Sequence, residues 1–252
     1  MKKLLKNTIF LSVCGLLAVL TAWIIAFFVL QNEKALPSPW ATAQAAVELL
    51  GKGGFYLSLL STLVRAVVAL SVALLFGVGL AVVAYLRPTF EKFLRGIVAV
   101  LRALPTMAAM LLILLGGDHS VAPVVVGVLT LFPMLYTATY TALQGVDKDL
   151  IEMSNAYRVP KSTQVKTLYF PSAMPSVLKE GVAALSFSLK LTVSAEVLAF
   201  TYRSLGGLMQ EANGAGEFAT MAALTVFVCL LGVLMEVLGG WCIRSWEEKR
   251  CA

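Results

Sequence analysis

Apolar residues gather along the chain in six long runs, and a polar or charged segment separates each run from the next. A helix needs about 20 mostly apolar residues to cross the hydrocarbon core of a bilayer, and every run reaches that length. The pattern therefore predicts an all-α polytopic membrane protein with six transmembrane helices. The expected spans are residues 8–30, 56–86, 94–115, 121–143, 175–200 and 219–243.

The first run also resembles a secretory signal peptide, because Lys2, Lys3 and Lys6 precede it. Its apolar stretch is longer than the hydrophobic region of a signal peptide, and no small-x-small cleavage site follows before Gln31. We therefore expect this run to be retained as the first span.

Lysine and arginine are distributed unevenly over the segments between the runs, and such residues concentrate on the cytoplasmic side of a membrane protein. One set of alternate segments holds Lys2, Lys3, Lys6, Arg87, Lys92, Arg95, Lys148, Arg158, Lys161, Lys166, Arg244, Lys249 and Arg250. The other set holds only Lys34, Lys52 and Arg203. This bias places both termini in the cytoplasm, which requires an even number of spans and agrees with six.

Three parts follow from this topology. We expect an N-terminal transmembrane helix and external loop over residues 1–55, and a five-helix core over residues 56–243. A cytoplasmic tail over residues 244–252 completes the chain. The core carries one long cytoplasmic loop, over residues 144–175.

Composition supports the membrane assignment and narrows the chemistry. The chain is 59% apolar and 13% charged, whereas a soluble domain is about a quarter charged. The net charge of +6 would suggest nucleic-acid binding in a soluble protein, but membrane topology explains the basic loops here. A single histidine, and four cysteines without a C-x-x-C pair, exclude the usual zinc spacings. The sequence also lacks a G-x-x-x-x-G-K-[ST] phosphate loop, so we expect no ATP site and no cofactor in this chain.

The cytoplasmic loop is too long for a mere connection and contains signals for two short helices. Asp149 with Glu152 is expected to cap a first helix over residues 151–157, which Pro160 stops. Ser162 is expected to cap a second helix over residues 163–169. Pro171 and Pro175 then end that helix and restart the chain at the fifth span. Two short helices at the membrane surface suit the docking of a partner.

This loop resembles the cytoplasmic signature of ABC importer permeases, which reads E-A-A, three residues, G, nine residues and I-x-L-P. Glu152 takes the first place and Pro171 the last. Leu168 and Phe170 take the apolar places before Pro171. Met153 and Ser154 replace the two alanines, and Arg158 replaces the glycine.

Further stretches are similar to the nitrate, sulfonate and taurine group of these permeases, in matching order. They are Leu36-Pro37-Ser38-Pro39, Ala103-Leu104-Pro105-Thr106, Ala195-Glu196 and Ser204-Leu205-Gly206-Gly207-Leu208. The resemblance implies a permease homodimer in the lipid of a bacterial inner membrane. It also implies an external solute-binding protein and a cytoplasmic ABC ATPase that binds ATP and magnesium. The implied solute is an organic or inorganic anion, such as a sulfonate or nitrate, or a vitamin precursor.

The docking surface implied by the resemblance consists of Glu152, Tyr157, Arg158, Pro160, Lys161 and Pro171. Two simpler roles remain open. Glu152 can serve only as a cap of its own helix, and Arg158 and Lys161 can contact lipid head groups.

Ionisable residues inside the expected spans are costly and often functional. Four candidates for such a role are Arg65, Lys190, Glu196 and Glu236. Arg65 and Lys190 could attract an anionic solute, but an interhelical ion pair with Glu196 or Glu236 is the favoured interpretation. Among other span and turn residues, Gly77, Gly79 and Gly127 are expected to allow close helix packing and His119 to lie in a solvated outer turn.

Other classes of membrane protein fit less well. A secondary transporter would show inverted repeats and broken helices, and a membrane enzyme would need clustered catalytic groups; the sequence indicates neither. A non-transporting scaffold stays open as an alternative.

Overall fold

The computed structural model describes residues 2–30, 32–33 and 36–251, and every regular element in these ranges is helical. The all-α expectation is therefore confirmed. Lys34, which the charge analysis counted, lies outside the described residues, as do the side chains of Lys2, Lys3, Lys6, Lys249 and Arg250.

The helices are α1 Lys2–Leu30, α2 Pro39–Leu50, α3 Gly53–Leu86, α4 Pro88–Ala103, α5 Thr106–Gly116, α6 Ala122–Gln144, α7 Lys148–Ala156, α8 Lys161–Gln164, the π-helix η1 Val165–Tyr169, α9 Phe170–Ala199, α10 Leu205–Ala215 and α11 Phe218–Cys251.

Four continuous helices in the described part of the chain are long and apolar enough to cross a membrane. They are α3, α6, the unbroken run Lys161–Ala199 that joins α8, η1 and α9, and Phe218–Ser245 within α11. The apolar pair α4 and α5 provides a fifth crossing if the two helices count as one span, and α1 contributes a shorter apolar stretch, Leu17–Leu30.

The third expected span is not one helix. Residues 94–115 contain a break between α4 and α5, and the two helices meet at 93°. Leu104 and Pro105 both have extended backbones, with ψ of 121° and 117°. Proline lacks an N–H and disfavours the helical conformation of the residue before it, so Pro105 ends α4. The expectation that no helix is broken was therefore wrong at this position.

The centre of the bundle is a close crossing of α3 and α6, which α9 covers. A Cβ added to Gly127 would lie 2.8 Å from the Cβ of Ala69, and one added to Gly77 would lie 3.0 Å from the Cβ of Leu135. Both glycines therefore allow the close approach expected of them, whereas nothing lies within 4 Å of a Cβ added to Gly79. Between helices in lipid, such close packing supplies much of the association energy.

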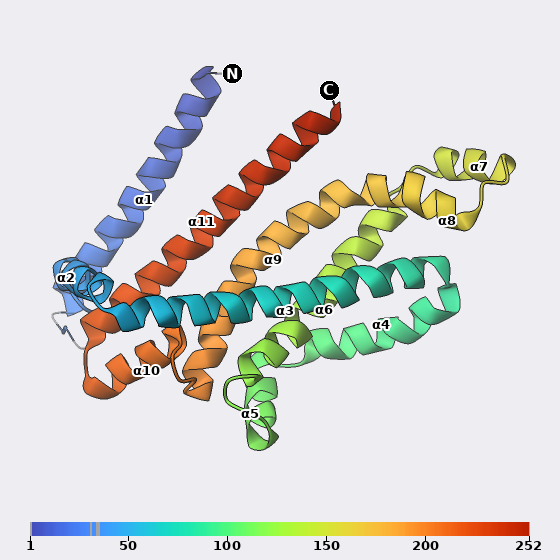
Figure 1. Cartoon of the computed structure of the whole chain (residues 1–252). Coiled ribbons are helices and arrows are strands. Elements are labelled where there is room, and N and C mark those ends of the chain that lie inside the picture. Colours follow the sequence, from blue (N-terminus) through green and yellow to red (C-terminus); the bar gives the residue numbers. More distant parts are fainter. Residues whose placement is uncertain (1, 31, 34–35, 252) are drawn as a thin grey trace.

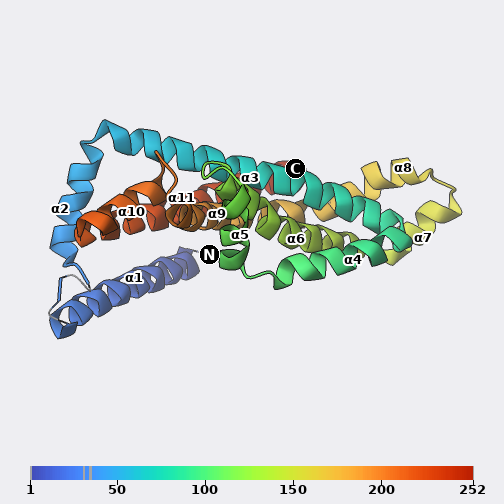
Figure 2. The ribbon, with the colours of Figure 1, turned by 90° about the horizontal axis from the view of Figure 1, so that it is seen from below.

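The helix α3 connects the two ends of the molecule. At 1.5 Å per residue its 34 residues extend about 51 Å, well beyond the roughly 30 Å of a hydrocarbon core. Figures 1 and 2 show α2 and α10 at one end of α3, and α7 and α8 at the other. The long loop after α6 therefore lies at the opposite end of the molecule from α2 and α10.

Candidate functional site

The first loop helix, α7, begins at Lys148, three residues before the expected start at residue 151. Asp147 is its N-cap, and its Oδ1 accepts a hydrogen bond of 2.9 Å from the backbone N–H of Asp149. The expected cap at Asp149 was therefore wrong, and Asp149 lies in the first turn, where its charge favours the helix dipole. Glu152 is thus not needed as the partner of a capping residue, and its side chain is exposed.

The C-terminal end of α7 is a left-handed turn centred on Arg158. Arg158 has φ of 52°, and its N–H donates to the carbonyl of Asn155 at 2.9 Å. The N–H of Val159 donates to the carbonyl of Ser154 at 3.0 Å, which completes a Schellman motif. This turn ends the helix before Pro160. Arg158 takes the glycine place of the importer signature, and its positive φ gives a physical reason for a glycine there.

The second loop helix does not stop at the prolines. The chain is helical without interruption over Lys161–Ala199, so Ser162 caps nothing and Pro171 and Pro175 do not separate a short helix from the fifth span. Pro171 has no N–H to donate to the carbonyl of Thr167, which breaks the regular hydrogen-bond ladder beside the π-helix η1. The loop therefore contains one short helix, α7, followed by a helix that runs directly into the membrane.

A buried side chain that sequence analysis missed joins these two helices. Gln164 is 5% exposed, and its Nε2 donates to Oδ1 of Asn155 and to the carbonyl of Val159, each at 3.0 Å. Both amide hydrogens are therefore used, one on the side chain of α7 and one on the turn that follows. These two bonds fix the angle of α7 relative to α8.

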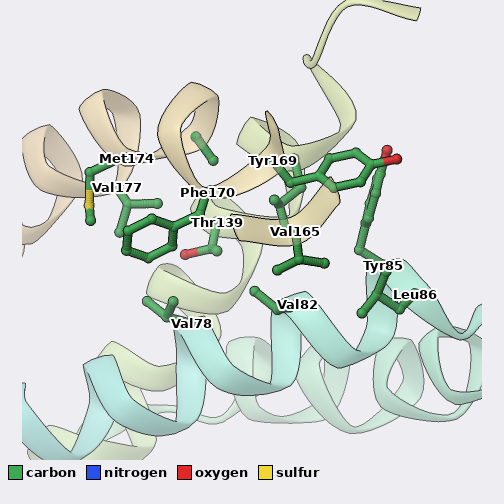
Figure 3. A pocket seen from close by; sticks show the side chains of 12 residues that line it. Val78, Val82, Tyr85, Leu86, Thr139, Val165, Tyr169, Phe170, Met174 and Val177 are labelled. Carbon is green, nitrogen blue, oxygen red and sulfur yellow. The ribbon is translucent and has the colours of Figure 1, made fainter. Parts of the chain in front are cut away.

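The inner side of the loop packs on the bundle and covers an apolar cavity. Ile151 on α7 and Val165 on η1 pack against a cluster that contains Leu143, Tyr169 and Ala173. Beside this cluster, α3, α6, η1 and α9 enclose a cavity of about 220 Å³ (Figure 3). Its lining is almost entirely apolar, with Val78 and Val82 of α3 facing Tyr169, Phe170 and Val177.

The outer side of α7 exposes apolar side chains. Leu150, Met153 and Tyr157 follow the i, i+3, i+7 spacing of one helix face, and they are 41%, 53% and 80% exposed. We call this surface the α7 face. The expected docking residues Glu152, Arg158, Pro160 and Lys161 are also exposed, whereas Pro171 is half-buried in the first turn of α9. Leu150 and Met153 are the members that sequence analysis missed.

A second group of polar residues lies at the other end of α9. Glu196 is fully buried, and its Oε1 lies 3.0 Å from Nη1 of Arg65 on α3. Its Oε2 accepts from the hydroxyl of Thr62 at 2.8 Å and from the backbone N–H of Gly206 at 3.3 Å. This is the interhelical ion pair that the sequence favoured.

The same group explains the glycine-rich stretch after Glu196. Ser204 is the N-cap of α10 and accepts from the N–H of Gly207 at 2.8 Å, while the N–H of Leu205 donates to Thr62 Oγ1 at 2.9 Å. A Cβ added to Gly206 would lie 2.4 Å from the Cβ of Glu196, so only glycine fits there. The two sequence stretches around Glu196 and Ser204 thus form one buried junction of α3, α9 and α10.

The remaining residues singled out from the sequence lie outside this junction. Lys190 on α9 and Glu236 on α11 are exposed, and neither forms an ion pair within the described part of the chain. His119 is exposed as expected, but it is also anchored. Its Nδ1 donates to the carbonyl of Ala199 at 2.6 Å, and its own carbonyl accepts from Thr201 Oγ1 at 2.9 Å.

A polar cavity beside the break between α4 and α5 was not foreseen. It measures about 470 Å³ and lies between the break, α6 and α9. Arg102 and Glu180 line it, and both charges fall inside spans predicted from hydropathy. Averaging over a long apolar run concealed these two residues, although each is visible in the sequence.

Comparison with known proteins places this architecture in a family. The family described as binding-protein-dependent transport system inner membrane component matches residues 73–247, which is more than half of the chain. The taurine transport system permease protein TauC of Escherichia coli is 24% identical over 241 residues, covering 93% of this chain and 86% of the relative. The aliphatic sulfonates transport permease protein SsuC of Escherichia coli is 27% identical over 220 residues, covering 85% and 82%.

Solved structures share the fold. The inward-facing MetNI methionine ABC transporter matches with a TM-score of 0.66 at 18% identity, covering 75% of this chain and 94% of that chain. An amino acid ABC transporter crystallised with histidines matches with a TM-score of 0.62 at 14% identity, covering 75% and 90%. The chain belongs to the family of binding-protein-dependent transport system inner membrane components and is a multi-pass permease subunit of a bacterial ABC importer.

Proposed function

We propose that two copies of this chain form the pathway of the importer, and that its ATPase docks on the α7 face. This proposal rests mainly on the exposure of Leu150, Met153 and Tyr157 on the outer side of α7. The hydrogen bonds of Gln164 hold the loop behind α7 in place. Apolar side chains on a cytoplasmic segment are unfavourable in water and indicate a protein partner. Glu152, Arg158 and Lys161 surround this face with charges that can orient the partner.

The continuous helix Lys161–Ala199 gives the docked ATPase a mechanical connection to the membrane. Gln164 couples α7 to the start of this 39-residue helix, and Glu196 couples its end to α3 and α10. A rigid helix transmits a displacement at one end along its length. Closure of the ATPase dimer on ATP and magnesium would therefore move α9 relative to α3, without any nucleotide bound to this chain.

The full topology that we propose has six spans and cytoplasmic termini. It counts α1 as the first span and the bent pair α4 and α5 as the third. Residues of α1 such as Ile25, Phe28 and Val29 are 63%, 66% and 76% exposed, which suits contact with lipid or with a second copy. In this arrangement α2 and α10 lie on the external side, where a solute-binding protein docks.

The solute that we propose is a small organic molecule with an anionic group such as a sulfonate. The relatives named above transport taurine and aliphatic sulfonates. Arg65 pairs with Glu196 in the buried junction. We therefore propose that Arg65 stabilises the fold and does not attract the solute. Lys190 is exposed on α9 and stays a candidate pathway charge.

The test is co-expression of the chain with the ATPase and solute-binding protein encoded beside it. We expect the ATPase to co-purify in detergent, and its ATP hydrolysis to rise when loaded binding protein is added. A matched sample with Met153→Asp should lose the ATPase while staying monodisperse. Solute uptake that proceeds in liposomes from an ion gradient, with no ATPase present, would replace this proposal with a secondary transporter. Absence of both uptake and ATPase binding would favour a scaffold.

A further inference from the structure

The polar cavity at the break between α4 and α5 has the composition of a ligand site. We call it the bend cavity. It lies between three membrane helices, and its polar lining consists of Arg102, Thr106, Thr130, Thr137 and Glu180. Arg102 is in the last turn of α4, Thr130 and Thr137 are on α6, and Glu180 is on α9. Elements that are far apart in the sequence thus bring one cation, one anion and three hydroxyl groups to a single space.

The two charges in the bend cavity are not used within the described structure. Arg95, on the same helix as Arg102, has its Nη2 2.8 Å from Oε1 of Glu91. Arg102 and Glu180 form no ion pair with each other or with any other residue in the described ranges. Arg102 is exposed and Glu180 is half-buried. Charged residues that line a cavity between membrane helices often mark functional sites. A ligand with one anionic and one cationic group could pair with both.

Two of the three hydroxyl groups in the bend cavity, those of Thr130 and Thr137, can only accept a hydrogen bond from a ligand. Thr130 Oγ1 donates to the carbonyl of Val126 at 2.9 Å, and Thr137 Oγ1 donates to the carbonyl of Pro133 at 2.7 Å. A threonine hydroxyl has one hydrogen, so both oxygens keep lone pairs but have no donor left. The cavity therefore offers acceptors from Glu180 and these two oxygens, and a strong cationic donor at Arg102.

We propose that the bend cavity is a solute-recognition site selective for a small zwitterion. The anionic group of the solute binds the guanidinium of Arg102, and its ammonium binds Glu180 and the threonine oxygens. An anion without an ammonium leaves the Glu180 carboxylate unpaired in the same small space, which disfavours it. The inference rests on the proposed pathway function and adds that the permease itself discriminates between solutes.

The test measures binding to the purified full-length chain in lipid nanodiscs, with no binding protein present. Radiolabelled taurine is the probe, because it carries a sulfonate and an ammonium on a two-carbon chain. Unlabelled taurine competes against ethanesulfonate, which has the same two-carbon sulfonate but no ammonium. We expect taurine to displace the label at a concentration at least about tenfold lower than ethanesulfonate, as a charge-assisted hydrogen bond implies.

Variants separate the two ends of the ligand. Arg102→Gln should weaken taurine binding by about tenfold or more, and Glu180→Gln should weaken it until taurine and ethanesulfonate compete equally. Arg87→Gln and Glu211→Gln, at exposed positions outside the cavity, should bind taurine as the native chain does.

Three results would overturn the proposal: no displaceable taurine binding at millimolar concentration, equal competition by ethanesulfonate on the native chain, or native binding by both cavity variants. Because the measurement needs no ATPase, such a failure is distinguishable from failure of the importer assignment. Loss of ATPase association would show the latter.

Discussion

The guanidinium of Arg65 on α3 donates to the carboxylate of Glu196 on α9, with Nη1 3.0 Å from Oε1, and Glu196 is fully buried. The hydroxyl of Thr62 and the backbone N–H of Gly206 donate to the second carboxylate oxygen. The Glu196 carboxylate therefore accepts hydrogen bonds from three separate groups. A buried charge with one partner removed is strongly destabilising, whereas a fully bonded one is tolerated. The pair therefore fixes the end of α9 that is opposite the α7 loop.

Glu196→Gln should destabilise the fold by about 3–5 kcal/mol, because the Arg65 charge loses its counter-charge in the bundle. Denaturant unfolding in detergent measures the loss, and Glu236→Gln, at an exposed position on α11, is the matched control. The double variant Arg65→Leu/Glu196→Gln removes both charges and keeps an acceptor for Thr62. It should recover more than half of the lost stability. A double variant less stable than Glu196→Gln alone would contradict this account.

Arg158→Gly should stabilise the α7 loop by about 1 kcal/mol, because an L-residue in the left-handed region costs roughly 1–2 kcal/mol that glycine avoids. Arg158→Val should destabilise the turn instead. Hydrogen exchange of the α7 amides reports both changes. If Arg158→Gly keeps the ATPase bound, the arginine acts through its backbone. If it releases the ATPase while the exchange slows, the guanidinium contributes to docking.

Charge placed on the α7 face should detach the ATPase. Met153→Asp puts a carboxylate in the middle of the exposed apolar surface, and its burial under a partner would cost several kcal/mol. Glu152→Lys reverses a charge at the edge of the same face and should weaken or uncouple docking. Co-purification and ATP hydrolysis measure the two effects. Lys148→Glu, at the start of α7, tests whether any charge change on the helix suffices. Normal transport by Glu152→Lys would remove this residue from the docking surface.

The apolar runs and the fold class could be predicted from the sequence, because length and composition alone decide whether a segment suits a bilayer. The break at Leu104 and Pro105 could not be predicted in the same way, since hydropathy averaged over residues 94–115 conceals a local backbone change. Pro105 was the sequence feature that could have indicated this break. At Pro171 and Pro175 the same signal misled, because the helix continues through both residues.

The candidate site divides along similar lines. Glu152 and Arg158 could be found by their spacing, because a signature is local. The partner of Arg65 could only be narrowed to a short list, since Glu196 is 131 residues away and its selection depends on how α3 and α9 cross. The burial of Gln164 could not be predicted from the sequence. A polar side chain in a polar loop is usually solvent-exposed, and Gln164 becomes buried only because the loop folds around it.

The apolar cavity under the loop should be necessary for movement of α9. Tight packing transmits force but resists displacement, and a cavity of about 220 Å³ beside η1 leaves room for the helix to shift toward α3. Val82→Phe would occupy part of that space from the α3 side. Because the added atoms enter an apolar space, the fold should keep its stability or gain some. We expect the ATPase to stay bound and solute uptake in liposomes to fall several-fold. Val83→Phe, on the adjacent exposed position, is the control for aromatic bulk. Equal uptake by the two variants would mean that the cavity plays no part in coupling, and α9 would then have to move without closing on α3.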